Sequence, residues 1–177
     1  MTGMNGAHAT SAEPMSVSRG WRVLLIAAAA LEFLGGVRDF PILFGNISEV
    51  PGPGLGGGII IAKIVLQPIL GLAALVCAWT GRLRESLLAM AAIILVTWLN
   101  FLPSITLHGL DFRGKDAFIS LHMILQIVLA PFLAAAVAAL AIRNRMTPAA
   151  IALSILPTLV GVLGVVAFAI SVAMHGF

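Results

Sequence analysis

The sequence predicts an all-α, polytopic membrane protein, a bundle of five transmembrane helices. Hydrophobic residues make up 60% of the 177 positions and charged residues only 10%, whereas a soluble domain carries about 25% charged residues. Mean hydropathy is +1.10. Several separate apolar runs are long enough to cross a hydrocarbon core of about 30 Å. The lack of alternating polar and apolar positions argues against an outer-membrane barrel.

Basic residues and the single cysteine point away from other classes of protein. The isoelectric point is near 10.0, but the ten Lys and Arg residues are scattered in ones and twos at segment ends. That distribution suits lipid headgroups, and we expect no nucleic-acid partner. Cys77 lies in an apolar run and has no cysteine to pair with within the chain, so we expect it to serve packing.

The sequence predicts a disordered segment at the N-terminus and a folded domain after it. Residues 1–20 are polar and small and predict a disordered cytoplasmic tail, whereas residues 21–177 form a single bundle domain. The first span is Trp21–Val37, with Trp21 and Arg22 as an interfacial anchor. Alternatively, this segment is a signal peptide cleaved at the small residues Ala28–Ala30, which would leave four helices.

The remaining spans follow from the apolar runs. Leu55–Thr80 is the central one, because it carries Lys63 and Gln67 within an apolar stretch of membrane-spanning length. Arg38–Gly54, rich in Pro and Gly, predicts an interfacial or shallow re-entrant loop, and Arg82–Glu85 a short turn. The other three predicted spans are Ser86–Leu107, Ala117–Ile142 and Ala149–Met174.

Prolines and small residues predict how these helices pack. Three prolines interrupt helices, and each frees a backbone carbonyl about one turn earlier, which then needs a donor from a neighbour. Glycines and the small-residue run Ala134–Ala139 favour close helix contacts. The prolines are Pro68, Pro131 and Pro157, and the glycines are Gly71, Gly161 and Gly164.

The distribution of basic residues predicts the orientation in a bacterial plasma membrane. Lys and Arg are retained on the cytoplasmic side. With the N-terminus inside, six basic residues fall on the inner side (Arg19, Arg22, Arg82, Arg84, Arg143 and Arg145) and three on the outer side (Arg38, Arg113 and Lys115). We therefore expect a cytoplasmic N-terminus and an external C-terminus.

Polar residues within the spans predict a pocket in the outer half of the bundle. Four of them fall within roughly 7 to 12 Å of the outer boundary when each is placed by 1.5 Å per residue. Glu32 and Asp39 share one helical face, and Lys63 and Gln67 share another. Because a buried charge is costly, we expect Glu32 to pair with Lys63. The predicted pocket residues are Glu32, Lys63, Gln67, Asn100, His122 and Gln126.

Four of the pocket residues also have a purely structural interpretation. Lys63 could extend to the aqueous interface without any partner, because its side chain tilts towards the outer end of its helix. His122 and Gln126 could form an ordinary interhelical hydrogen-bonding pair. Asn100 could join helices by hydrogen bonds that contribute about 0.6 kcal/mol.

No catalytic motif stands out, which favours a non-enzymatic function. The sequence suggests either an accessory subunit of a larger membrane complex or a binding and permeation unit for a small solute or a proton. Its expected partners are the lipid bilayer and either other membrane subunits or further copies of the same chain. The competing class is a redox protein that holds haem or quinone, with His108, His122 and His175 as the haem candidates. If the protein is non-enzymatic, we expect it to hold no cofactor.

Overall fold

The computed structural model describes residues 17–45, 55–102, 124–143 and 148–175, and within these ranges every regular element is a helix. The expected all-α class and helical bundle are confirmed for this part of the chain. The elements are α1 (Arg19–Asp39), η1, a 3₁₀ turn (Phe40–Phe44), α2 (Leu55–Thr80), α3 (Leu83–Leu99), η3, a π-helical turn (Leu125–Leu129), α6 (Ala130–Ile142) and α7 (Pro148–His175).

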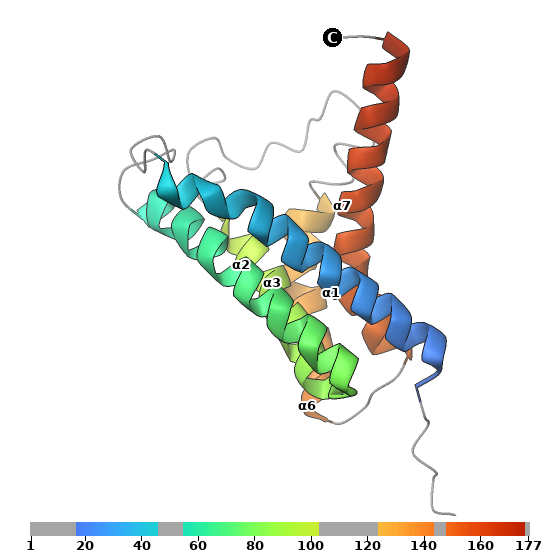
Figure 1. The fold of residues 1–177 in the computed structure, drawn as a ribbon. Helices are drawn as coiled ribbons and strands as arrows, with labels where there is room; N and C mark the ends of the chain where they lie inside the picture. Colours follow the sequence, from blue (N-terminus) through green and yellow to red (C-terminus); the bar gives the residue numbers. More distant parts are fainter. Residues whose placement is uncertain (1–16, 46–54, 103–123, 144–147, 176–177) are drawn as a thin grey trace, which may run out of the picture.

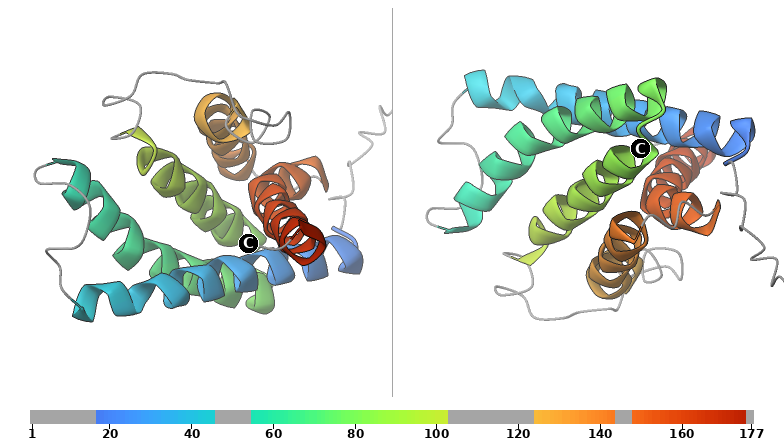
Figure 2. Two further views of the ribbon diagram at one scale, coloured as in Figure 1. Left: turned by 90° about the horizontal axis from the view of Figure 1, so that it is seen from above. Right: turned by 90° about the horizontal axis from the view of Figure 1, so that it is seen from below.

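The long helices form a closed bundle (Figure 1). α1 packs against α2, α2 against α3, α3 against α6 and α6 against α7, and α7 returns to contact α1. Seen from above and below in Figure 2, α3 lies between α2 and α6, and α7 lies beside α1. The C-terminal half of α7 extends beyond the other described helices (Figure 1).

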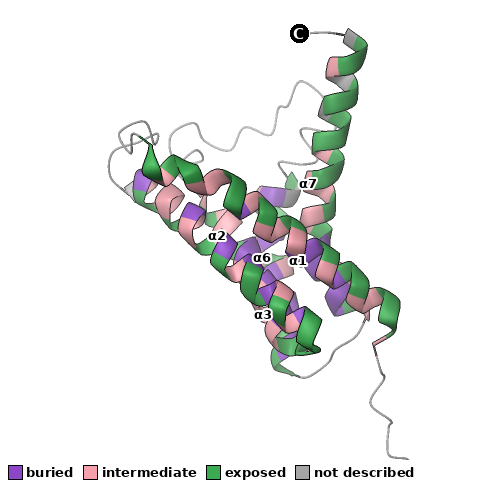
Figure 3. Ribbon diagram, viewed as in Figure 1, coloured by how far each residue is buried: buried purple, intermediate pink, exposed green. Residues whose placement is uncertain are grey.

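The hydrophobic core lies at one end of this bundle. It is built from the first half of α1, the end of α2, the first half of α3, the end of α6 and the start of α7. Small residues in α1 and α2 let the helices approach closely there. Figure 3 shows buried residues on all five helices and mostly exposed or half-buried residues along the outer part of α7. The fully enclosed residues include Leu25, Ala29, Ala78, Leu87, Val137 and Ile151.

Two glycines fix the register between α1 and α2. A Cβ on Gly36 would lie 2.6 Å from the backbone nitrogen of Pro68, and one on Gly71 would lie 2.7 Å from the backbone of Phe33. Both distances are too short for any side chain, so only glycine permits this crossing. The expectation for Gly71 is confirmed. The expectation for Gly161 is wrong, because a Cβ there would meet no atom within 4 Å.

The turn between α2 and α3 shows a role for Arg22 that differs from the expected interfacial anchor. Its Nε donates to the carbonyl of Ala78 at 3.0 Å and its Nη2 donates to that of Trp79. These carbonyls belong to the last turn of α2, where backbone acceptors lack helical partners. Gly81 then turns the chain with φ +84°. Arg22 therefore caps α2 from the neighbouring helix.

Several predicted boundaries need correction. α1 begins at Arg19, so Gly20 belongs to the helix and not to a tail, and it continues to Asp39. Phe40–Phe44 forms helical turns where a loop was expected, since the aromatic rings of Phe40 and Phe44 pack edge to face at 5.6 Å. Leu83 already starts α3, so the predicted Arg82–Glu85 turn is shorter than expected. Residues 1–16 and 46–54 lie outside the described part.

Pro131 has the expected effect on its helix. It cannot donate to the carbonyl four positions earlier, that of Ile127, and the chain widens into a π-helical turn just before it. The indole nitrogen of Trp98 on α3 donates to that carbonyl at 3.0 Å. The need for a neighbouring donor is thus confirmed at this proline.

Two helices of the described part are long and apolar enough to cross a membrane, by length and composition. They are Gly56–Thr80 and Pro148–Met174, of 25 and 27 residues. α3 has 17 residues and α1 carries charges along its length. Parts of the predicted third and fourth spans, residues 103–123, lie outside the described residues. Five spans therefore remain a prediction.

Candidate functional site

A cavity of about 540 Å³ lies where the helices separate beyond the core, between α1, α2, α3, η3 and α7. Four of the six predicted pocket residues line it: Glu32, Lys63, Gln67 and Gln126. Asn100 is described, at the end of α3, but is not part of the lining. His122 lies outside the described residues. The structure thus brings together residues from α1, α2 and η3 that are up to 94 positions apart (126 minus 32).

Glu32 is held by neutral donors from two other helices. Its Oε2 accepts a hydrogen bond of 3.0 Å from Nε2 of Gln67 on α2, and its Oε1 accepts one of 2.7 Å from Oγ1 of Thr158 on α7. The carboxylate is half-buried and lies on the cavity wall. Among the described residues, no basic side chain donates to it.

Lys63 does not pair with Glu32, contrary to expectation. Its Nζ lies 2.8 Å from Oδ2 of Asp39, and Nε of Arg38 lies 3.4 Å from Oδ1 of the same carboxylate. Burial raises the pKa of Asp39, but the hydrogen bond and charge of Lys63, aided by Arg38, outweigh burial and hold that pKa below its ordinary value of 3.8. Asp39 lies two helical turns beyond Glu32, so the α1–α2 register selects it as the partner of Lys63.

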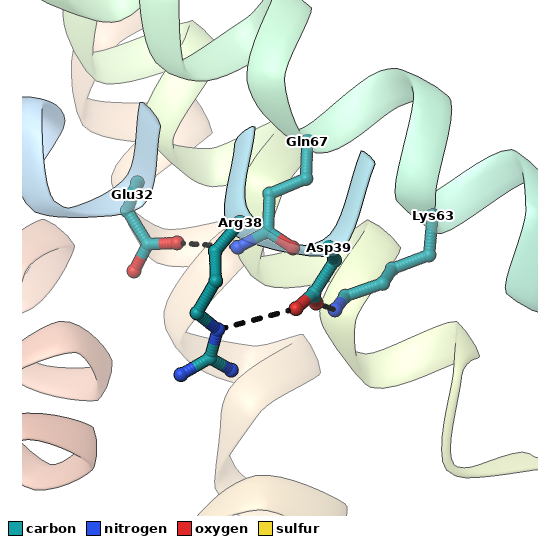
Figure 4. Close-up of polar contacts among 5 residues, drawn as sticks. All are labelled: Glu32, Arg38, Asp39, Lys63 and Gln67. Atoms are coloured by element: carbon teal, nitrogen blue, oxygen red, sulfur yellow. Dashed lines mark hydrogen bonds and ion pairs between the residues drawn. The ribbon is translucent and has the colours of Figure 1, made fainter. Parts of the chain in front are cut away.

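Gln67 lies between the two carboxylates in the view of Figure 4. Its Nε2 is turned to Glu32, and its Oε1 is buried with no hydrogen-bond partner among the described residues. A buried carbonyl oxygen without a donor costs about 1 to 3 kcal/mol. The Gln67 amide is therefore oriented to give Glu32 a donor, and this orientation leaves the oxygen of Gln67 without one.

The rest of the lining is mostly aliphatic. Ile93 and Ile94 come from α3, and Val162 and Val165 come from α7. Leu34 and Val165 are 60% and 68% exposed, so the cavity opens to the surface along the α1–α7 edge. Apolar walls with a few convergent polar groups are typical of small-molecule sites, whose volumes run from about 300 to 1,000 Å³.

Sequence reasoning missed Asp39 and Thr158 as members of this polar network. Asp39 carried a usable signal, because it shares a helical face with Glu32 and ends the same helix. Thr158 carried none, since a single threonine after Pro157 in an apolar helix is unremarkable in sequence. Its role depends on α7 packing against α1.

The redox alternative depends on side chains that the structure does not describe. His108 and His122 lie outside the described residues, and at His175 only the backbone is described. In the described ranges no three His, Cys, Asp or Glu side chains are placed to hold a metal ion together. The haem reading therefore still depends on the sequence alone.

No protein-family model matches this sequence, and comparisons with curated proteins and with solved structures give no match.

Proposed function

We propose that this protein is a non-enzymatic membrane protein that binds a small solute in the cavity beside Glu32. The observation that carries the proposal is the state of Glu32, a carboxylate on a cavity wall whose hydrogen-bond partners are Gln67 and Thr158. Glu32 is half-buried, so its carboxylate is partly shielded from water, and a ligand that donates hydrogen bonds or carries positive charge would stabilise it. An apolar side chain would serve helix packing at lower cost, so Glu32 favours binding.

Two helices support placement in a membrane. Gly56–Thr80 and Pro148–Met174 have the necessary length and hydropathy, and only 6% of the apolar window in the second is buried. Large apolar side chains therefore cover the outer surface of α7, as lipid would require. Those more than half exposed are Leu163, Val165, Ile170 and Met174.

The proposal includes five spans with the N-terminus in the cytoplasm. This orientation rests on the excess of basic residues on the inner side. It would place the tight core towards the cytoplasm and the Glu32 cavity towards the outer face. Alkaline extraction of membranes tests the membrane location, since an integral protein stays in the pellet until detergent is added.

Solute binding is tested by thermal unfolding of the full-length protein in lipid nanodiscs with a panel of small solutes. Binding to the folded state raises the melting temperature in proportion to the logarithm of ligand concentration. At least one solute should stabilise the wild type and have no effect on Glu32→Gln. If every solute changes the melting temperatures of the wild type and Glu32→Gln equally, the cavity is not the binding site.

A further inference from the structure

We propose that the solute is an organic cation, a protonated primary or secondary amine on an aliphatic body. This inference rests on the solute-binding function proposed above and names the class of ligand. The charges, the hydrogen-bonding capacity and the shape of the cavity each support it.

Among the described residues, the charges around the cavity leave one carboxylate without a basic partner. The described residues that line it include Glu32, Lys63 and Arg38 as charged groups. Both basic side chains are directed to Asp39, at 2.8 and 3.4 Å, and the side chain of Arg38 is 83% exposed. Glu32 is left with the neutral donors Gln67 and Thr158. A cation in the cavity would give Glu32 a direct positively charged partner.

The hydrogen-bonding capacity at Glu32 also favours a donor. A carboxylate offers about four acceptor positions, of which the contacts with Gln67 and Thr158 use two. The hydroxyl proton of Thr158 is committed to Glu32, so its oxygen can only accept from a ligand. An ammonium group carries N–H donors and no acceptor, and it matches this arrangement.

The walls of the cavity indicate the chemistry of the ligand beyond its charge. Ile93, Ile94, Val162 and Val165 offer aliphatic surface, and the described lining includes no aromatic ring. Quaternary ammonium groups are recognised by aromatic cages, so an ammonium with N–H donors suits this site better. A volume of about 540 Å³ also far exceeds what a bare ion needs.

Four probes of equal chain length separate these features: hexylammonium, hexyltrimethylammonium, 1-hexanol and hexanoate. Each is titrated into the full-length protein in zwitterionic nanodiscs, and its dissociation constant is derived from the shift in melting temperature. We expect hexylammonium to bind at least tenfold more tightly than the other three. Glu32→Gln should abolish that preference.

Two further variants complete the design. Glu85→Gln removes the same charge from the start of α3, at a residue paired with Arg82 outside the cavity lining, and should leave binding unchanged. Gly161→Leu should block every probe by filling the cavity, because a Cβ there meets nothing within 4 Å. This second variant keeps the test informative if Glu32→Gln does not fold.

The outcomes distinguish the two proposals. Binding of hexanol or hexanoate that equals that of hexylammonium, and that Gly161→Leu abolishes, would overturn the cation assignment and leave solute binding intact. If neither Gly161→Leu nor Glu32→Gln changes the binding of any probe, both the solute-binding function and the cation assignment are overturned. Equal binding of hexyltrimethylammonium would overturn the requirement for N–H donors.

Discussion

Glu32 on α1 accepts a hydrogen bond of 2.7 Å from the hydroxyl of Thr158 on α7, a residue 126 positions later in the chain. The contact joins the first described helix to the last. Replacing Thr158 with Val removes the donor but keeps the shape, so the free energy of unfolding should fall by about 1 kcal/mol. Chemical unfolding in mild detergent measures the change. Thr158→Ser retains the hydroxyl and serves as the control, and equal losses in both variants would argue against the hydrogen bond.

The Lys63–Asp39 ion pair should show measurable coupling. Its side chains are 18% and 23% exposed, so water screens the pair incompletely. In a double-mutant cycle with Lys63→Met and Asp39→Asn we expect a coupling energy of about 1 to 2 kcal/mol. The Arg82–Glu85 pair, 65% and 43% exposed, is the control and should couple by less than about 0.5 kcal/mol. Additive effects of Lys63→Met and Asp39→Asn would refute the ion pair.

The lowered pKa of Asp39 predicts a loss of stability in acid. Its pKa in the folded state lies below the ordinary value of 3.8. Near that pH the unfolded chain therefore binds more protons than the folded one. The stabilisation is complete above the unfolded pKa and is lost as the pH falls through the folded pKa.

Melting temperatures measured from pH 6 to pH 2 check this. The Asp39→Asn variant should lose less stability than the wild type as the pH falls below 3.8. Glu85, whose pKa is also lowered, by a backbone hydrogen bond and then by Arg82, contributes in the same direction. Its Glu85→Gln variant is the comparison. Parallel curves for wild type and Asp39→Asn would show that Asp39 is not the source.

Gly36 should tolerate no side chain. Gly36→Ala places a methyl group 2.6 Å from the backbone of Pro68, which forces α1 and α2 apart and should cost about 1 to 3 kcal/mol. Gly58→Ala, on α2 with nothing within 4 Å, should be neutral or stabilising by up to about 1 kcal/mol. Thermal unfolding distinguishes the two. Similar effects at both positions would contradict the close crossing.

The hydrogen bond from Trp98 to the carbonyl of Ile127 should matter only because Pro131 follows. Trp98→Phe leaves that carbonyl without the indole donor, at a cost of about 1 to 3 kcal/mol together with the lost packing. Pro131→Ala restores a backbone N–H, so the same Trp98→Phe change should cost less in the Pro131→Ala background. The difference between the two costs is obtained from unfolding in detergent. Identical costs would mean that Trp98 acts through packing alone.

Much of the local structure could be predicted from the sequence. The predicted span Leu55–Thr80 is also the helix α2, residue for residue, because only Lys63 and Gln67 interrupt its apolar stretch and Gly81 ends it. Helical periodicity placed Lys63 with Gln67 and Glu32 with Asp39 on shared faces. Three of the four predicted residues that line the cavity, Glu32, Lys63 and Gln67, belong to these faces.

The choice of partners could not be predicted. Glu32 and Asp39 are both on the face of α1 that meets α2, and they differ by two helical turns, about 10 Å. The contact of Gly36 with Pro68 sets the register, and that register brings Lys63 to Asp39 and Gln67 to Glu32. Periodicity defines a face but not a height along it, so a sequence pattern leaves both pairings open.

The sequence by itself determined that this chain is helical, where its main apolar segments lie and which polar residues share a face, since composition and period are local properties. Only the tertiary structure decided that α7 returns to α1, that Thr158 serves Glu32 and that a cavity remains beside them. Hydrogen bonds form over about 3 Å, so they depend on how whole helices are positioned. That positioning is set by contacts between segments far apart in the chain.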